Sequence, residues 1–138
     1  MGKGKRKRFN VRVYGILIRK GYVLVSDEFV FGRLITKFPG GGLEFGEGPE
    51  DCIIREAKEE LGVAVRLEEH FYTTGFYQQS AFRDDEQVIS IYYRILNESE
   101  IPGDRFHRSR SDLSSKEGAE ALRWVGFEDL DAEEMDLP

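Results

Sequence analysis

Three glutamates stand close together in the segment REAKEEL, namely Glu56, Glu59 and Glu60. If this segment is helical, the i, i+3, i+4 spacing brings their carboxylates toward one face, where like charges repel each other. A divalent cation would relieve that repulsion, and hard oxygen ligands suit Mg²⁺ or Mn²⁺, which also bind phosphate oxygens. A solvent-facing acidic stripe is the plain alternative, and this segment alone does not exclude it, because glutamate is a good helix former.

A helix from Pro49 to Leu61 is predicted to carry these glutamates. Pro49 suits the first helical turn, acidic residues follow it where the helix dipole is positive, and Gly62 is a natural terminator. Apolar residues that recur with the helical period share one side of this segment and should face the core. These residues are Ile53, Ile54, Ala57 and Leu61.

A glycine-rich segment, PGGG, precedes this helix. Pro39 and the three glycines after it exclude regular structure in residues 39–42, so we expect a loop there. Because glycine has no side chain, the loop can approach a ligand closely, and its carbonyl oxygens can join the coordination shell of a metal. Loop and helix together therefore form one candidate site.

Most other segments are predicted to be β-strands. The stretch from Phe9 to Leu24 is rich in β-branched and aromatic residues around Lys20-Gly21, which predicts a hairpin. Further strands are predicted in residues 29–38, 63–67, 87–96 and 122–127. Residues 98–116 are predicted to be a polar loop. A short helix is predicted from Phe127 to Met135, and it could continue past Pro138. One strong helix among many strands indicates the α+β class with a mixed sheet.

Length and composition favour a single folded domain in residues 9–138. A chain of 138 residues with 40% hydrophobic residues can build one hydrophobic core, but a second independent core is not expected. The basic residues 1–8, MGKGKRKR, are expected to be a disordered N-terminus. The net charge of −6 argues against general nucleic-acid binding.

The single cysteine, Cys52, bears on the cellular compartment. It excludes an intramolecular disulfide and a cysteine-only metal site, so the sequence favours a reducing cytoplasm. No apolar run has the length of a bilayer span or a signal sequence, and no membrane association is expected. The oligomeric state is left open, and a homodimer is compatible with the sequence.

The pattern from Gly41 to Val63 carries a family resemblance. Gly41 is followed after five residues by Glu47 and, after seven more, by the run REAKEELGV. This pattern resembles the Nudix box at every fixed position, and Pro39-Gly40 precede it as they often do in that family. The resemblance implies the Nudix fold, a mixed β-sheet sandwiched between helices (α/β/α).

The resemblance also implies roles for the residues of this box. Glu56, Glu59 and Glu60 would hold divalent ions, and one of them would help to deprotonate water. The carbonyl of Gly41 would be a further ligand. Glu47 and Arg55 would pair and brace the glycine-rich loop, since an arginine fork fixes a carboxylate well. The implied reaction is attack of water at phosphorus, assisted by Mg²⁺, with Mn²⁺ as a substitute.

Members of the family often recruit one more glutamate from outside the box. Glu117 and Glu120 are the strongest candidates here, and Glu86 is a third. The sequence does not choose among them, and a plain surface carboxylate is the alternative for each.

Three further residues are candidates for substrate binding. Arg12 and Lys37 lie on predicted strands that could point toward the site, where they would contact substrate phosphates. Tyr77, with its neighbours Tyr72 and Phe76, could stack on a nucleobase, although aromatic residues of this kind more often belong to the core.

Other reaction types find little support. His70 and His107 lack partners at metal-ligand spacing, and no P-loop or dinucleotide-binding pattern is present. The first hypothesis is therefore a Mg²⁺-dependent hydrolase that cuts a diphosphate linkage in a nucleoside diphosphate joined to another group, such as a nucleoside triphosphate or nucleotide sugar. Two alternatives are left open: a nucleotide-sensing module without turnover, and a pyrophosphohydrolase of RNA 5′ ends guided by the basic N-terminus.

Overall fold

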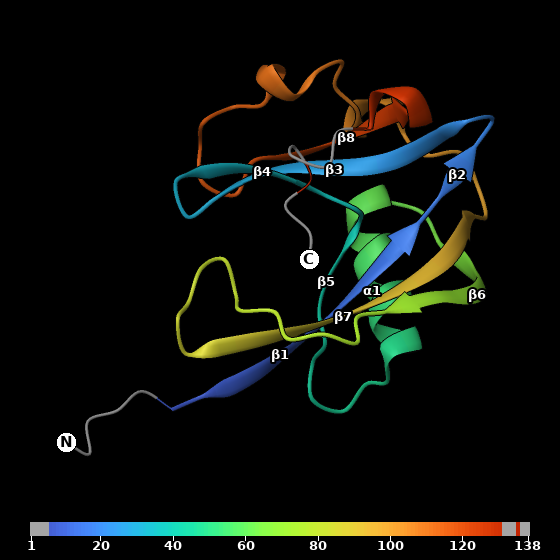
Figure 1. The fold of residues 1–138 in the computed structure, drawn as a ribbon. Helices are drawn as coiled ribbons and strands as arrows, with labels where there is room; N and C mark the ends of the chain where they lie inside the picture. Colours follow the sequence, from blue (N-terminus) through green and yellow to red (C-terminus); the bar gives the residue numbers. More distant parts are fainter. Residues whose placement is uncertain (1–5, 131–134, 136–138) are drawn as a thin grey trace.

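Two four-stranded sheets and one α-helix make up the described part of the computed structural model, which is residues 6–130 and 135 (Figure 1). The first sheet has the order β5-β1-β7-β6. Its strands are β1 (Arg8–Ile16), β5 (Gly40–Gly42), β6 (Val65–Thr73) and β7 (Glu86–Asn97). Strands β1 and β7 run parallel and the other pairs antiparallel, so the mixed sheet and the α+β class are confirmed.

The second sheet is built around β3 (Tyr22–Val30), which pairs with β2 (Ile18–Arg19), β4 (Arg33–Lys37) and β8 (Glu120–Gly126). The predicted hairpin at Lys20-Gly21 is the β2–β3 connection, and a second tight turn at Phe31-Gly32 joins β3 to β4. All four turn residues have positive φ, which is the backbone geometry of the turns that match the twist of paired strands. The predicted strand 29–38 is therefore divided by a turn.

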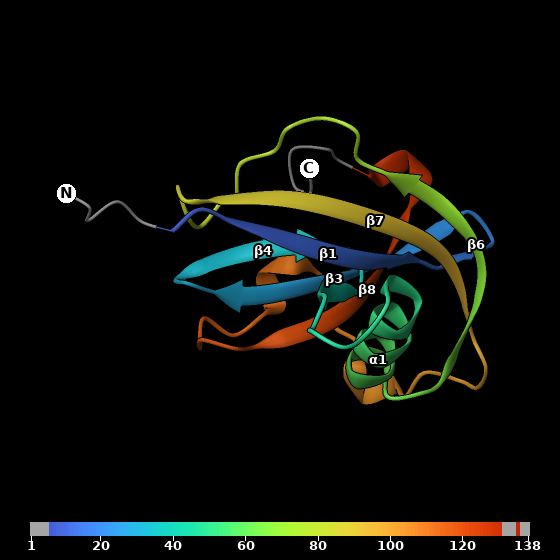
Figure 2. The same cartoon turned by 90° about the horizontal axis from the view of Figure 1, so that it is seen from below.

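Helix α1 (Pro49–Leu61) has the predicted bounds. Gly48 N donates to the Asp51 carboxylate at its start, and Gly62 ends it with φ 78. The predicted apolar stripe is wrong at one position, because Ile54 is 41% exposed and Cys52 faces the core instead. Helix α1 packs against β1, β5 and β6, and Figure 2 shows β6 and β7 curving around it.

The predicted loop at residues 39–42 is partly wrong, because Gly40–Gly42 form strand β5. This strand pairs antiparallel with β1, and the partners of its glycines are Arg12, Val13 and Tyr14. A side chain at Gly40 would overlap the backbone of Val13 and Tyr14. The glycines thus allow a close strand contact, which local sequence signals do not reveal.

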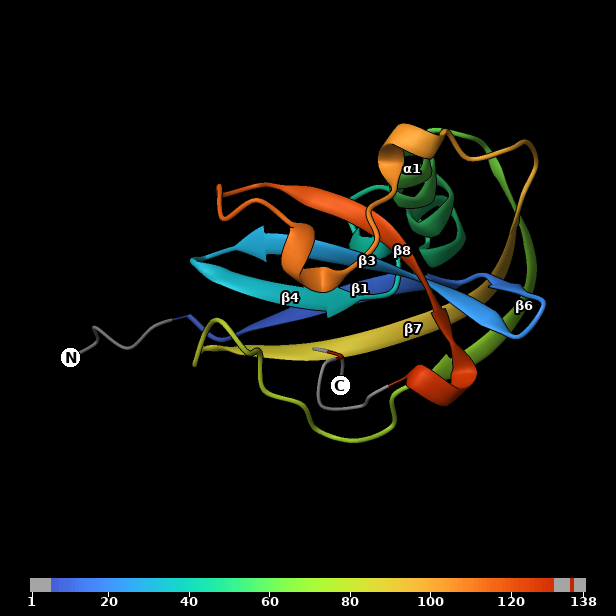
Figure 3. The same ribbon diagram turned by 90° about the horizontal axis from the view of Figure 1, so that it is seen from above.

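The segments near the ends of the chain differ in part from the prediction. Strand β1 already begins at Arg8, which pairs with Glu86. The polar loop 98–116 contains two short 3₁₀ turns, Gly103–Arg105 and Arg110–Asp112, and Figure 3 shows the first of them beside α1. In the described part of the helix expected from Phe127 to Met135, residues Phe127–Asp129 form a 3₁₀ turn. Residues 1–5, 131–134 and 136–138 lie outside the described residues.

Buried side chains of both sheets and α1 form a hydrophobic core of two clusters. Its largest cluster joins β1, α1 and β7 through Val13, Ile53 and Ile95, all at most 1% exposed. In residues 6–130 and 135, no helix combines the length and apolar character needed to cross a membrane.

Candidate metal and substrate site

An acidic pocket of about 280 Å³ lies where α1, β5 and the second sheet meet. It is lined by five carboxylates, two cationic side chains and the three glycines of β5. These residues are Glu28, Glu56, Glu59, Glu60, Glu120, Arg12, Lys37, Gly40, Gly41 and Gly42. The three glutamates predicted to converge from α1 therefore do face one site, together with the predicted residues Gly41, Glu120, Arg12 and Lys37.

The tightest carboxylate group in this pocket is Glu28, Glu60 and Glu120, each with an oxygen within 4.8 Å of the other two. Glu28 and Glu120 are directly opposite each other on the antiparallel strands β3 and β8, an arrangement that repulsion between like charges makes unfavourable without a cation. An all-oxygen donor set of this kind fits a hard divalent ion such as Mg²⁺.

Glu28 was missed by the sequence prediction. It lies on β3 beside Asp27, and two acidic residues within the mostly apolar run YVLVSDEFV were the available signal. A charge in a half-buried strand is costly unless it has a partner, so Asp27 and Glu28 each require a partner of opposite charge or a hydrogen-bond donor. Its register opposite Glu120 depends on the fold.

Lys37 supplies positive charge at the centre of this group. Its Nζ lies 3.0 Å from Glu28 Oε2 and 3.1 Å from Glu60 Oε1, and it also donates to the carbonyl of Gly40 at 3.0 Å. Burial opposes the charge on Lys37, but the carboxylates of Glu60 and Glu28 outweigh it and raise the lysine pKa. The ammonium thus compensates part of the negative charge.

Glu60 is the most deeply buried carboxylate of the predicted box, at 8% exposure. It accepts hydrogen bonds from Lys37 and from Gly40 N, the latter at 2.7 Å. Burial raises the pKa of Glu60 to about 7 against the effect of Lys37, and nearby Glu28 adds to the rise. A bound divalent cation would stabilise the ionised form.

Glu56 and Glu59 line the same pocket with more open carboxylates. The Glu56 side chain is 18% exposed and lies 3.2 Å from Arg55 Nη1, whereas the Glu59 side chain is 61% exposed. A side chain at Gly41 would overlap the Glu56 carboxylate, so glycine is needed there. The carbonyl oxygen of Gly41 lies 3.9 Å from the Sγ of buried Cys52.

Arg55 and Glu47 form the expected ion pair. Arg55 donates through Nη2 to Glu47 Oε1 at 2.6 Å and through Nε to Oε2 at 3.1 Å, while Nη2 also reaches the carbonyl of Gly42 at 3.2 Å. Hydrogen bonds from Arg55, and then from Glu44 N, lower the pKa of Glu47 to about 2. The arginine therefore ties the segment after β5 to α1.

Arg105 supports the other end of α1 and was not predicted. Its Nη1 donates to the carbonyls of Glu59 and Glu60, at 2.8 and 3.0 Å. These are carbonyls of the last helical turn, which lack partners within the helix, and a cation is favourable there. The loop 98–116 thereby fixes the backbone of two pocket glutamates.

A buried polar network surrounds Asp27, the neighbour of Glu28 on β3. Asp27, fully buried, accepts hydrogen bonds from Arg123 at 2.8 and 3.1 Å, from Thr36 at 2.6 Å and from His107 at 2.8 Å. Burial would raise the pKa of Asp27, but the hydrogen bonds from its three partners outweigh it and lower the pKa. His107, which has no partner at metal-ligand spacing in the sequence, is thus a hydrogen-bond partner of Asp27.

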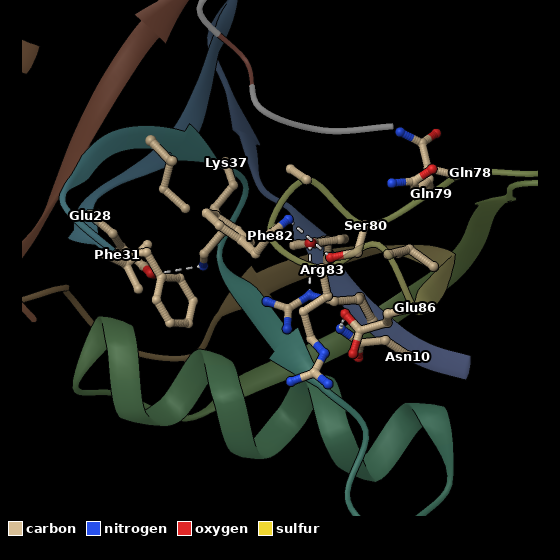
Figure 4. Close-up of a pocket in the computed structure, with 16 residues that line it drawn as sticks. Asn10, Glu28, Phe31, Lys37, Gln78, Gln79, Ser80, Phe82, Arg83 and Glu86 are labelled. Atoms are coloured by element: carbon tan, nitrogen blue, oxygen red, sulfur yellow. Dashed lines mark hydrogen bonds and ion pairs between the residues drawn. The ribbon is translucent and has the colours of Figure 1, made fainter. Parts of the chain in front are cut away.

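A larger cleft of about 650 Å³ adjoins the acidic pocket and shares Arg12, Glu28 and Lys37 with it (Figure 4). The cleft is lined by β1, the β3–β4 hairpin, the start of β7 and residues 78–83. Tyr77, predicted to bind substrate, is 68% exposed and is not among the lining residues.

Two other predicted glutamates lie away from the acidic pocket. Glu117 accepts hydrogen bonds from the backbone N–H groups of Phe31 and Gly32, at 2.7 and 3.2 Å, so its carboxylate caps the β3–β4 turn. Glu86 accepts from Asn10 Nδ2 at 3.2 Å and lines the larger cleft. Of the three candidates from outside the box, the structure brings Glu120 to the acidic pocket.

Comparison with known proteins decides the family. A model of the NUDIX domain matches residues 6–138. The chain belongs to the Nudix family. Two solved structures have the same fold. A NUDIX hydrolase from Nitrosomonas europaea is 19% identical with a TM-score of 0.67, and the match covers 94% of this chain and 81% of the other. A MutT NUDIX hydrolase from Burkholderia pseudomallei is 20% identical with a TM-score of 0.64, and the match covers 89% of this chain and 87% of the other.

Curated Nudix relatives share shorter stretches with this chain. An 8-oxo-dGTP diphosphatase from Haemophilus influenzae is 32% identical over 96 residues, which is 70% of this chain and 58% of the relative. An RNA pyrophosphohydrolase from Nitratiruptor is 32% identical over 62 residues, which is 42% of this chain and 40% of the relative. The matches thus span about half the length of these relatives.

Proposed function

We propose that this Nudix protein is a Mg²⁺-dependent hydrolase that cuts a diphosphate linkage in a nucleoside diphosphate joined to another group. The observation that carries the proposal is the acidic pocket, which is lined by five carboxylates and two cationic side chains and adjoins a cleft large enough for a nucleoside. Mn²⁺ would substitute for Mg²⁺, since both prefer oxygen ligands. The diphosphatase and pyrophosphohydrolase activities named for two relatives support this class of reaction.

The side chains of the pocket have distinct roles in the proposed hydrolysis. Glu28, Glu60 and Glu120 would hold the cation, with Glu56 and Glu59 completing the oxygen ligands at the rim. When bound, the cation supplies Lewis-acid activation of water and neutralises charge on the phosphates.

Two cationic side chains, Arg12 and Lys37, and the exposed carboxylate of Glu59 would act directly on the reactants. Arg12 and Lys37 lie at the junction of the pocket and the cleft, where they would neutralise and orient a diphosphate. Glu59 has a more exposed carboxylate than Glu56, Glu60 or Glu28, so it is well placed to take a proton from attacking water. Water attack at phosphorus then needs no covalent enzyme intermediate.

A substrate panel in H₂¹⁸O tests the proposal. Nucleoside triphosphates, nucleotide sugars, ADP-ribose, dinucleoside polyphosphates and a 5′-triphosphorylated RNA are offered with Mg²⁺ and with a chelator. We expect Mg²⁺-dependent turnover with one ¹⁸O in a phosphoryl product, and loss of turnover in Glu59→Gln and Glu60→Gln variants that keep the wild-type circular dichroism spectrum.

Two other outcomes would change the assignment. Nucleotide binding without turnover of any compound would favour a sensing module. Turnover of the RNA alone, abolished by deletion of the basic residues 1–8, would favour action on RNA 5′ ends.

A further inference from the structure

The larger cleft extends from the diphosphate site toward a second polar end. Its shared residues, Arg12, Glu28 and Lys37, fix where a diphosphate would enter it. Figure 4 shows Asn10 and Glu86 at the end of the cleft opposite Glu28 and Lys37. A nucleotide with its phosphates in the acidic pocket would therefore extend its base toward Asn10 and Glu86.

Asn10 and Glu86 are held together on one face of the first sheet. They lie on the parallel strands β1 and β7, and Asn10 Nδ2 donates to Glu86 Oε1 at 3.2 Å. The backbone also anchors this end, because Ser80 N donates to the carbonyl of Glu86 at 2.9 Å. The bond from Asn10 uses one lone pair of Oε1, so the other lone pair of Oε1 and both lone pairs of Oε2 can still accept hydrogen bonds from a ligand.

An ionised carboxylate can only accept hydrogen bonds, and the nucleobases differ in what they offer it. Guanine presents two adjacent donors on its pairing edge, the ring N1–H and the exocyclic amino group. Adenine and cytosine place a ring nitrogen acceptor beside their amino group, and uracil and thymine flank a single N–H with two carbonyls. A carboxylate at this position therefore matches a guanine edge and repels part of each other edge.

An aromatic pair covers another part of the cleft. The rings of Phe31 and Phe82 have centroids 4.9 Å apart, although Phe31 is 69% and Phe82 42% exposed. Phe31 has φ 53, an unusual conformation for a bulky residue, and Glu117 holds it by accepting from its N–H. Exposed rings held in this way offer a stacking surface to a base.

We infer that the cleft is a base subsite in which the Glu86 carboxylate, held by Asn10, selects a guanine-type base and the Phe31–Phe82 pair stacks on it. This inference rests on the proposed function, because it assigns the base of the same nucleotide. Gln78, Gln79 and Ser80 line the same end and would add hydrogen bonds to the base.

Glu86→Gln tests the selection. The amide of glutamine can both donate and accept, as adenine requires. We expect wild type to have a higher kcat/KM for GTP than for ATP, and the variant to lose about tenfold or more of that ratio, partly by gaining activity on ATP. The matched control is Glu69→Gln, an exposed position on β6, which should keep the wild-type ratio. Equal use of GTP and ATP by wild type, or an unchanged ratio in Glu86→Gln, would overturn the inference.

Binding measured without turnover separates this inference from the proposed function. Calorimetry with GDP and ADP in metal-free buffer should show a preference for GDP that Glu86→Gln removes. If that preference is found but no nucleotide is hydrolysed, the hydrolase proposal fails and the base subsite stands. If nucleotides are hydrolysed with no base preference, the subsite fails and the hydrolase proposal stands.

A separate measurement tests the proposed stacking of the base on Phe31. Phe31→Ala should raise KM for GTP and ATP together, by about fivefold or more, and leave their ratio unchanged, because stacking does not depend on the pairing edge. An unchanged KM for both nucleotides would contradict a role for Phe31 in binding.

Discussion

The ammonium of Lys37 donates a hydrogen bond to the carboxylate of Glu60, with 3.1 Å between Nζ and Oε1. Both side chains are at least 92% buried, so each charge depends on the other. Lys37→Met should destabilise the metal-free protein by about 3 kcal/mol or more, because it leaves buried carboxylates without a counter-charge.

Chemical denaturation with and without Mg²⁺ measures this effect. Mg²⁺ should stabilise the Lys37→Met variant more than wild type, because the variant lacks the ammonium and the cation then compensates the charge of the buried carboxylates in its place. Lys58→Met, at an exposed position of α1, is the control and should match wild type. Equal stabilisation of all three proteins by Mg²⁺ would show that Lys37 and the cation do not share one charge site.

The bidentate contact of Arg55 with Glu47 predicts that lysine cannot replace the arginine. A single ammonium cannot bond both oxygens of Glu47 and the carbonyl of Gly42 in the same geometry. Arg55→Lys should lower kcat/KM by about 10- to 100-fold, as for other residues that orient metal ligands. Hydrogen exchange in residues 42–48 should become faster.

The matched control for this change is Arg66→Lys, at an exposed position of β6. It should leave both activity and exchange unaltered. If Arg55→Lys keeps the wild-type rate of hydrogen exchange and the wild-type activity, the ion pair does not brace the site.

Asp27 predicts an acid-dependent loss of stability. Its folded pKa lies below the ordinary value of 3.8, so it contributes stability above that value, which is lost as pH falls through the folded pKa. Asp27→Asn should lower the free energy of unfolding by about 3 kcal/mol at pH 7, because Arg123 loses its buried anionic partner.

The difference in stability between wild type and Asp27→Asn should shrink as pH is lowered below about 4, since wild-type Asp27 then becomes protonated as well. Denaturation midpoints between pH 2 and pH 7 would measure it. A difference that stays constant over that range would refute the contribution of the Asp27 charge.

The local parts of the site could be predicted from the sequence. The bounds of α1 follow from Pro49 and Gly62, which act within one turn of the helix ends. The spacing of Glu56, Glu59 and Glu60 places them on neighbouring positions of that helix, and they do line one pocket.

The parts that depend on distant pairing could not be predicted. Glu28 meets Glu120 through the register of β3 with β8, and β5 exists because its glycines fit against β1. Glu117 and Glu120 are close in sequence, yet one caps the β3–β4 turn and the other enters the pocket. Spacing alone gives no means of separating them, because both are carboxylates at the start of the same strand or shortly before it.

Binding of Mn²⁺ to the Glu120→Gln and Glu117→Gln variants, followed by electron paramagnetic resonance, tests whether the acidic pocket holds the cation. Glu120→Gln should weaken Mn²⁺ binding by at least about tenfold, because it removes a carboxylate of the tight group, and Glu117→Gln should leave it at the wild-type value. Weakened binding in Glu117→Gln with wild-type binding in Glu120→Gln would contradict the assignment of this pocket as the metal site.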